Sequence, residues 1–170
     1  MTSLVVMGVA GCGKSSLGSV VARAEGLALV EGDDFHREES REKMRRGVAL
    51  TDADRAGWLD QLAQQLRHQQ HGLVLTCSAL KRTYRDHLRQ ACPGLRFVFL
   101  EIAREHAQAR VSARAEKHFF AASLVDSQFA TLEEPAGEPG VLCVDALAPL
   151  SQLQQQVTDW LHSSRKTDDF

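Results

Sequence analysis

Residues 8–15 read Gly8-Val9-Ala10-Gly11-Cys12-Gly13-Lys14-Ser15, which fits the pattern G-x-x-x-x-G-K-[ST] of a phosphate-binding loop. The apolar run 4–7 comes directly before it, so the loop is expected to join a buried strand to the start of a helix. Glycines let such a loop curl until successive backbone N–H groups point at phosphate oxygens, and the helix N-terminus adds a favourable dipole. The stretch therefore predicts a nucleotide-binding turn. A glycine-rich turn that binds nothing is the lesser alternative.

Two side chains of this loop have direct chemical roles in such a motif. Lys14 can reach the β- and γ-phosphates of a nucleotide, and the Ser15 hydroxyl can ligate Mg²⁺. Cys12 is interpreted as a small residue that fits a tight loop. A catalytic thiol at this position is the weaker alternative, because the sequence positions no base for it.

The remainder of the chain alternates short apolar runs with helical patterns. Further apolar runs lie at 27–30, 73–77, 97–100 and 141–144, and helical spacing of apolar residues marks 54–71 and 150–161. Alternating β and α segments predict an α/β fold in which helices cover both faces of a parallel sheet. Ligands of such sheets bind at the carboxyl ends of the strands, so the residues after each run are the candidates for function.

Composition limits the class of protein. The 170 residues are 44% apolar and 25% charged, which fits one globular domain and excludes disorder, collagen and coiled coil. A formal net charge of −2 and an aromatic share of 6% argue against a nucleic-acid partner and against attraction to an anionic membrane. The start of the chain lacks the pattern of a signal peptide or a membrane span. The four cysteines lack the spacing of a metal site, so they are expected to be free thiols rather than metal ligands. Free thiols favour a reducing, cytoplasmic location.

Polar residues after the second and third runs point to the acceptor of the phosphoryl group. Asp33 and Asp34 follow the second run, where a carboxylate can accept a proton from an acceptor hydroxyl or order the Mg²⁺ shell; capping the next helix is the alternative. The third run is followed by Ser78-Ala79-Leu80-Lys81-Arg82, without the magnesium-linked Asp of motors and GTPase switches. Lys81 suits an anionic substrate, and a solvated lysine at a helix start is its alternative.

Several blocks of the chain resemble the gluconokinases of the P-loop, adenylate-kinase-like type. Besides the loop at 8–15, these blocks are G-D-x-x-H at 32–36, K-M at 43–44, L-x-D-x-D-R-x-x-W-L at 50–59, C-S-A-L-K-x-x-Y-R-D at 77–86, and late segments at 118–120, 124–129 and 131–135. Together they run from residue 4 to about residue 145 in family order.

The resemblance implies ATP-dependent phosphorylation of D-gluconate to 6-phosphogluconate, with Mg²⁺ as the second cofactor. It implies a P-loop NTPase fold with a five-stranded parallel sheet in the order 2-3-1-4-5, helices on both faces and a helical lid over about 110–129. The expected organisation is a single kinase domain over 1–165 and a frayed tail over 166–170. A homodimer is compatible with the family.

Roles carried over from the family fall on matching positions. The nucleotide would be held by Gly8, Gly11, Cys12, Gly13, Lys14, Ser15 and Ser16, with Ser15 also holding Mg²⁺. The catalytic set would be Lys14, Asp33 and Arg114. The gluconate pocket would comprise Asp33, His36, Arg55, Lys81, His118 and Gln128.

Arg55 is the expected partner of the gluconate carboxylate, because its planar fork can bind a carboxylate bidentately. A surface pairing with Asp52, three residues earlier, is the alternative for Arg55. In the lid, Arg110 and Arg114 are four residues apart and would share one helix face, from which they could stabilise charge in the transition state. A solvated basic face is the alternative for that pair, and a packing histidine is the alternative for His118.

The sequence also departs from the family pattern. Arg37 stands where the family usually has Pro, Ser40 where it has Asn, and Ala49 where it has Pro. The segment 114–118 is one residue longer than the usual lid motif and lacks its glycine. These departures bear on sugar recognition and lid closure rather than on the phosphate site.

The competing functions are another small-molecule P-loop kinase, such as a shikimate-type kinase, and a regulator that binds ATP without transferring phosphate.

Overall fold

A computed structural model describes residues 2–114 and 123–163. It contains a five-stranded sheet whose strands are all parallel, in the order β2-β3-β1-β4-β5. The strands are β1 (Leu4–Met7), β2 (Ala28–Glu31), β3 (Leu73–Thr76), β4 (Arg96–Glu101) and β5 (Val141–Asp145). The α/β class and the predicted strand order are confirmed. The predicted tail at 166–170 and residues 115–122 of the predicted lid lie outside the described residues.

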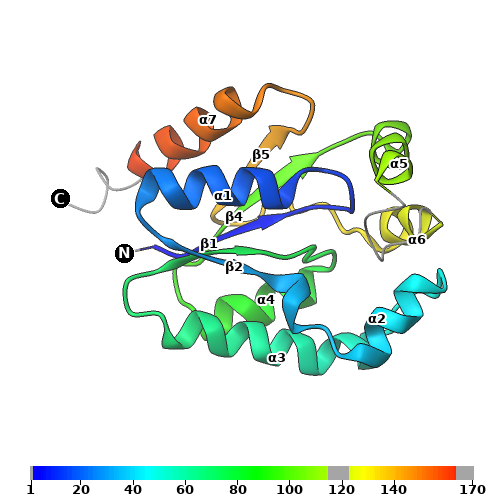
Figure 1. Ribbon diagram of the computed structural model, residues 1–170. Helices are drawn as coiled ribbons and strands as arrows, with labels where there is room; N and C mark the ends of the chain where they lie inside the picture. The colour runs from blue at the N-terminus through cyan, green and yellow to red at the C-terminus, as the bar shows by residue number, and fades with distance from the viewer. Residues whose placement is uncertain (1, 115–122, 164–170) are drawn as a thin grey trace.

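Helices cover both faces of the sheet, as Figure 1 shows. One face carries α1 (Lys14–Glu25) and α7 (Leu150–Ser163), and the other carries α3 (Asp52–His68) and α4 (Arg82–Ala91). Three further helices gather beyond the carboxyl ends of the strands: α2 (Glu38–Arg45), α5 (Arg104–Ala113) and α6 (Leu124–Thr131). A single 3₁₀ turn, η1 (Gly32–Phe35), follows β2. Among the described helices, none is long and apolar enough to cross a bilayer.

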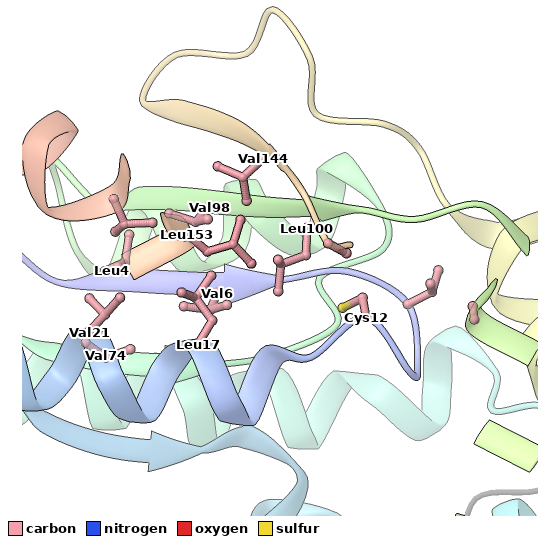
Figure 2. Close-up of a cluster of buried hydrophobic side chains, with 14 of the residues drawn as sticks. Leu4, Val6, Cys12, Leu17, Val21, Val74, Val98, Leu100, Val144 and Leu153 are labelled. Atoms are coloured by element: carbon pink, nitrogen blue, oxygen red, sulfur yellow. The ribbon is translucent and has the colours of Figure 1, made fainter. Parts of the chain in front are cut away.

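Alternation along the strands divides the interior into two cores. On β1, Leu4 and Val6 face α1 and α7, whereas Val5 and Met7 face α3 and α4, because successive side chains of a strand point to opposite faces. Figure 2 shows Leu4 and Val6 in the core beneath α1. Both faces of this strand are fully buried, which explains why it reads as a continuous apolar run rather than an alternating one.

Local signals set the limits of the helices. Gly26 ends α1 in the left-handed conformation, with φ 66°. Helix α3 begins at Asp52 rather than at the predicted residue 54, because Thr51 and Asp54 form a capping box: the Asp54 N–H donates to Thr51 Oγ1 and the Thr51 N–H donates to the Asp54 carboxylate. The helix ends at His68, three residues before the predicted end, since the chain turns at Gly72 with φ 83° to enter β3.

Candidate active site

The phosphate-binding loop occupies the turn between β1 and α1. Gly8, Gly11 and Gly13 have φ values of 145°, 83° and 99°, which a residue with a side chain rarely adopts. The curled backbone leads directly into the N-terminus of α1, where N–H groups without helical partners favour an anion. The Lys14 ammonium lies over the loop and donates to the carbonyls of Gly8 at 3.0 Å and Val9 at 3.1 Å.

One cavity extends from this loop across the carboxyl edge of the sheet. Its lining brings together ten of the predicted site residues: Gly11, Gly13, Lys14, Ser15, Ser16, Asp33, His36, Arg55, Arg114 and Gln128. Gly8, Cys12 and Lys81 are not among the described residues that line it. Cys12 is buried in the core beneath the loop, so it supports the turn from below rather than offering its side chain to a ligand. His118 lies outside the described residues.

Asp33 reaches the cavity from the turn after β2. Gly32 makes that turn possible, because a Cβ there would lie 2.3 Å from the carbonyl oxygen of Thr76. The Trp58 indole N–H also donates to the Gly32 carbonyl at 2.7 Å and fixes the turn from α3. The Asp33 side chain is 69% exposed within the open cleft. Desolvation by the surrounding protein raises the pKa of Asp33, because it disfavours the charged carboxylate. The contact with His36 and the positive charges of Lys14 and Arg41 outweigh this desolvation, so the pKa is lowered overall. The carboxylate is therefore ionised at neutral pH.

His36 completes this side of the cavity. Its ring stacks on Trp58 with centroids 4.4 Å apart and planes 15° from parallel. Its Nε2 lies 3.6 Å from Asp33 Oδ1, while Nδ1 is buried and has no hydrogen-bond partner within the described residues.

Arg55 also lines the cavity, held from behind by α4. Its Nη1 donates to the Tyr84 hydroxyl at 3.3 Å, and that hydroxyl in turn donates to Asp52. Lys81 forms an ion pair with the same Asp52 at 3.0 Å. Lys81 thus lies behind Arg55, where it pairs with Asp52, and is not among the described residues of the cavity wall. The alternative pairing of Arg55 with Asp52 is not what the structure shows, because Tyr84 lies between them.

The arginines of the predicted lid have different environments. Arg110 donates to the carbonyls of Gly11 at 3.1 Å and of Ala146 at 3.2 Å, so it ties the phosphate-binding loop to the turn after β5. Arg114 is exposed, lines the cavity, and sits one residue past the end of α5. The helix ends at Ala113, and Arg114 Nε donates to the Arg110 carbonyl at 3.4 Å.

Helix α6 contacts the phosphate-binding loop directly. The Ala10 N–H donates to Gln128 Oε1 at 2.7 Å, a contact between residues 118 positions apart. Gln128 thus lines the cavity next to the phosphate-binding loop, whereas the sequence assigned it to the gluconate pocket. Ser40, one of the departures from the family pattern, is buried and is not among the described lining residues, whereas Ala49 is part of the lining.

Sequence reasoning missed Glu31, the last residue of β2. Its Oε2 accepts from the Ser15 hydroxyl at 3.0 Å and also from the Thr76 hydroxyl. The Ser15 hydroxyl and the Glu31 carboxylate together give hard oxygen donors beside the loop, which suit Mg²⁺ when phosphate oxygens and water complete the shell. Glu31 stands directly before the quoted G-D-x-x-H block, so its position at a strand end was a usable signal.

Comparison with known proteins gives consistent relatives. A family model described as "AAA domain" matches residues 4–138. The gluconokinase of Gluconobacter oxydans is 45% identical over 144 residues, covering 83% of this chain and 80% of the relative. The thermoresistant gluconokinase of Escherichia coli is 41% identical over 150 residues, covering 86% of this chain and 85% of the relative. The crystal structure of a gluconokinase from Sinorhizobium meliloti superposes with a TM-score of 0.90 at 39% identity, over 99% of this chain and 98% of that one.

Proposed function

The chain belongs to the gluconokinases, within the AAA-domain family, and on this premise we propose that it transfers the γ-phosphoryl group of ATP to a hydroxyl of D-gluconate, giving 6-phosphogluconate. The observation that carries the proposal is the position of Asp33. This ionised carboxylate lies in the same cavity as Lys14 and the phosphate-binding loop, with Arg55 also on the wall. The cavity can therefore hold a nucleotide phosphate and an anionic polyol together.

The nucleotide half takes the triphosphate. Backbone N–H groups of residues 11–16 bind phosphate oxygens, and Lys14 turns from the loop carbonyls toward the β- and γ-phosphates. Mg²⁺ fits beside the Ser15 hydroxyl, with Glu31 as a nearby carboxylate, and when bound it neutralises charge that builds on the phosphates. The Cys12 side chain holds the loop from the core side without touching the nucleotide.

The acceptor half holds gluconate. Arg55 binds the substrate carboxylate, because its position against Tyr84 leaves the rest of the guanidinium fork for a ligand. His36 lines the same cavity and contributes to the acceptor half beside Asp33. Lys81 contributes through Asp52 rather than by direct contact.

Asp33 acts on the attacking hydroxyl. Its lowered pKa makes it a weak base, so its main work is to orient the hydroxyl toward the γ-phosphorus and to receive the proton as the new P–O bond forms. This is sufficient because phosphoryl transfer through a loose transition state needs little base strength. Arg114 stabilises the charge that spreads over the transferring group.

Two further expectations accompany this function. Four free cysteines suit a reducing compartment, so we propose a cytoplasmic location. A homodimer is compatible with the family, and measurement of the mass in solution would show whether one forms.

The test is ADP release with MgATP and a panel of acceptors: D-gluconate, other sugar acids, shikimate, AMP and no acceptor. Stimulation by gluconate above the other acceptors is expected, with Lys14→Ala as the inactive control. Stimulation by a different acceptor would move the specificity to another small-molecule kinase. ATP binding without any stimulated release would favour the non-transferring regulator.

A further inference from the structure

Arg85 in α4 is a fully buried charged side chain that the proposed chemistry does not use. Its guanidinium makes four hydrogen bonds: two to the carboxylate of Glu138, at 3.0 and 2.6 Å, one to the Ala79 carbonyl at 2.7 Å, and one to the Glu133 carbonyl at 2.8 Å. One side chain thus joins three segments: α4, the loop after β3, and the connection between α6 and β5. We call this set of contacts around Arg85 the Arg85 junction.

The ion pair with Glu138 does not by itself explain why an arginine stands here. A buried pair is often replaceable by apolar side chains without loss of stability, because desolvation offsets much of the attraction. What an apolar residue or a lysine cannot supply is a rigid fork that bonds two backbone carbonyls and a carboxylate at once. The junction therefore points to a role in geometry.

The geometry concerns the loop between β3 and α4. Ala79 has φ 47°, a left-handed conformation that a non-glycine residue adopts only when its surroundings hold it there. Arg85 bonds the carbonyl of this strained residue. Its neighbour Ser78 lines the cavity and accepts from the N–H of Gly8, the first glycine of the phosphate-binding loop. The phosphate-binding loop thus holds Ser78, and Arg85 holds the neighbouring Ala79 in its strained conformation.

The junction also fixes both sides of this loop. The Glu133 N–H donates to the Leu80 carbonyl at 2.7 Å, and Glu133 Oε1 accepts from the Arg82 N–H at the start of α4 at 3.0 Å. Tyr84, in the same first turns of α4, supports Arg55. The loop and the helix that Arg85 positions therefore supply Ser78 to the cavity wall and the support of Arg55 to the acceptor half.

We propose that Arg85 is a positioning residue for the phosphoryl acceptor: by holding Ala79 in its strained conformation and anchoring Glu133 at the start of α4, it sets Tyr84 and, through Tyr84, Arg55 beside the substrate. The inference rests on the proposed function, since it concerns the same cavity. It predicts that loss of the fork weakens acceptor binding while nucleotide binding is retained.

The test is steady-state kinetics of Arg85→Lys, with gluconate and ATP varied separately. The KM for gluconate is expected to rise about tenfold, a moderate effect for a small displacement of a positioned group, while the KM for ATP stays within about twofold. A purely structural role would lower the amount of active enzyme, and hence the apparent kcat, without this separation of the two KM values. An unchanged KM for gluconate, or an equal rise in both KM values, would overturn the inference.

Arg89→Lys is the matched control. Arg89 also pairs with Glu138, at 3.0 Å, and with Asp86, at 2.9 Å, but its bonds in the described residues do not include the carbonyls of Ala79 or Glu133. Both KM values of this control are expected to stay within about twofold of the wild type. A rise in the KM for gluconate alone in Arg89→Lys would assign the effect to the charges around Glu138 and remove Arg85 from the positioning role.

A second variant covers the case in which Arg85→Lys does not fold. Arg85→Met combined with Glu138→Leu removes both members of the buried pair, so neither charge is left uncompensated. The same rise in the KM for gluconate alone is expected, and a wild-type value would overturn the inference. Wild-type protein in which gluconate does not stimulate ADP release would instead remove the proposed function on which the inference rests.

Discussion

Charges around the turn after β2 determine whether the Asp33 carboxyl group, which faces the acceptor, is ionised. Lys14 and Arg41 contribute positive charge near Asp33, and His36 touches it, so the pKa of Asp33 stays below its usual value. The carboxylate is then ionised through neutral and mildly acidic pH. Its exposure in the cleft keeps it accessible to a substrate hydroxyl.

Asp33→Asn is expected to lower kcat about 100-fold or more, because the amide keeps the shape but cannot accept the hydroxyl proton. In the wild type, the loss of rate from protonating Asp33 should begin at a lower pH than for an ordinary aspartate, since a lowered pKa delays protonation as the pH falls. The measurement is kcat at saturating MgATP and gluconate across pH. Asp34→Asn is the control, because Asp34 is not among the described lining residues. A folded Asp33→Asn enzyme within a few-fold of wild type would remove Asp33 from this role.

Arg55→Lys tests the carboxylate contact while keeping the positive charge. The KM for gluconate is expected to rise about tenfold, because lysine cannot bind a carboxylate bidentately, whereas the KM for ATP should change little. Arg67→Lys, on an exposed position of the same helix, is the control. A larger effect on the KM for ATP would place Arg55 on the nucleotide side.

Glu31→Gln tests the carboxylate beside Ser15. The Mg²⁺ concentration for half-maximal rate should rise about tenfold, the lower end of the effect of changing a group that orients a metal ligand. Titration with Mg²⁺ at fixed ATP gives this value. Glu25→Gln, at the far end of α1, is the control. An unchanged Mg²⁺ requirement would mean that Glu31 only anchors the Ser15 side chain.

At the scale of elements, α3 shows where local signals suffice and where they do not. Its apolar spacing predicted a helix over 54–71, but the true start depends on the reciprocal bonds of Thr51 and Asp54, which spacing does not contain. The strands were predictable because each contains a short apolar run next to a turn. The Ala10–Gln128 contact and the Arg85 junction were not, since they join segments far apart in the chain and depend on tertiary packing.

Thr51→Ala should lower the free energy of unfolding by about 1 kcal/mol at neutral pH, the usual value of an N-cap. Chemical denaturation measures this loss. The partner Asp54 has its pKa lowered to about 2 by Lys43 and by Thr51. Because the folded pKa lies below the unfolded one, the Asp54 contribution is present above about pH 4 and is lost as the pH falls toward 2. A Thr51→Ala protein with wild-type stability would show that packing alone fixes the start of α3.

At the scale of the whole molecule, ligand binding should raise thermal stability. At a MgATP concentration of about 100 times Kd the folded state gains about 2.7 kcal/mol, which for a chain of this size corresponds to a rise in Tm of about 5 °C or more. Thermal denaturation with and without EDTA separates the metal contribution, and a smaller rise is expected when the metal is chelated. Lys14→Ala should lose most of the shift; an equal shift in that variant would contradict the role of Lys14.

The two separate cores have a consequence for how this protein can diversify. The core beneath α1 includes Val9 and Cys12 and supports the nucleotide loop, whereas the opposite core includes Trp58, Ala79 and Tyr84 and supports the acceptor side. The sheet acts as a partition between them. Substitutions that change which acceptor is bound can therefore accumulate on one side of the sheet while the nucleotide loop on the other side is conserved. Such variants can bind new sugar acids and still use ATP.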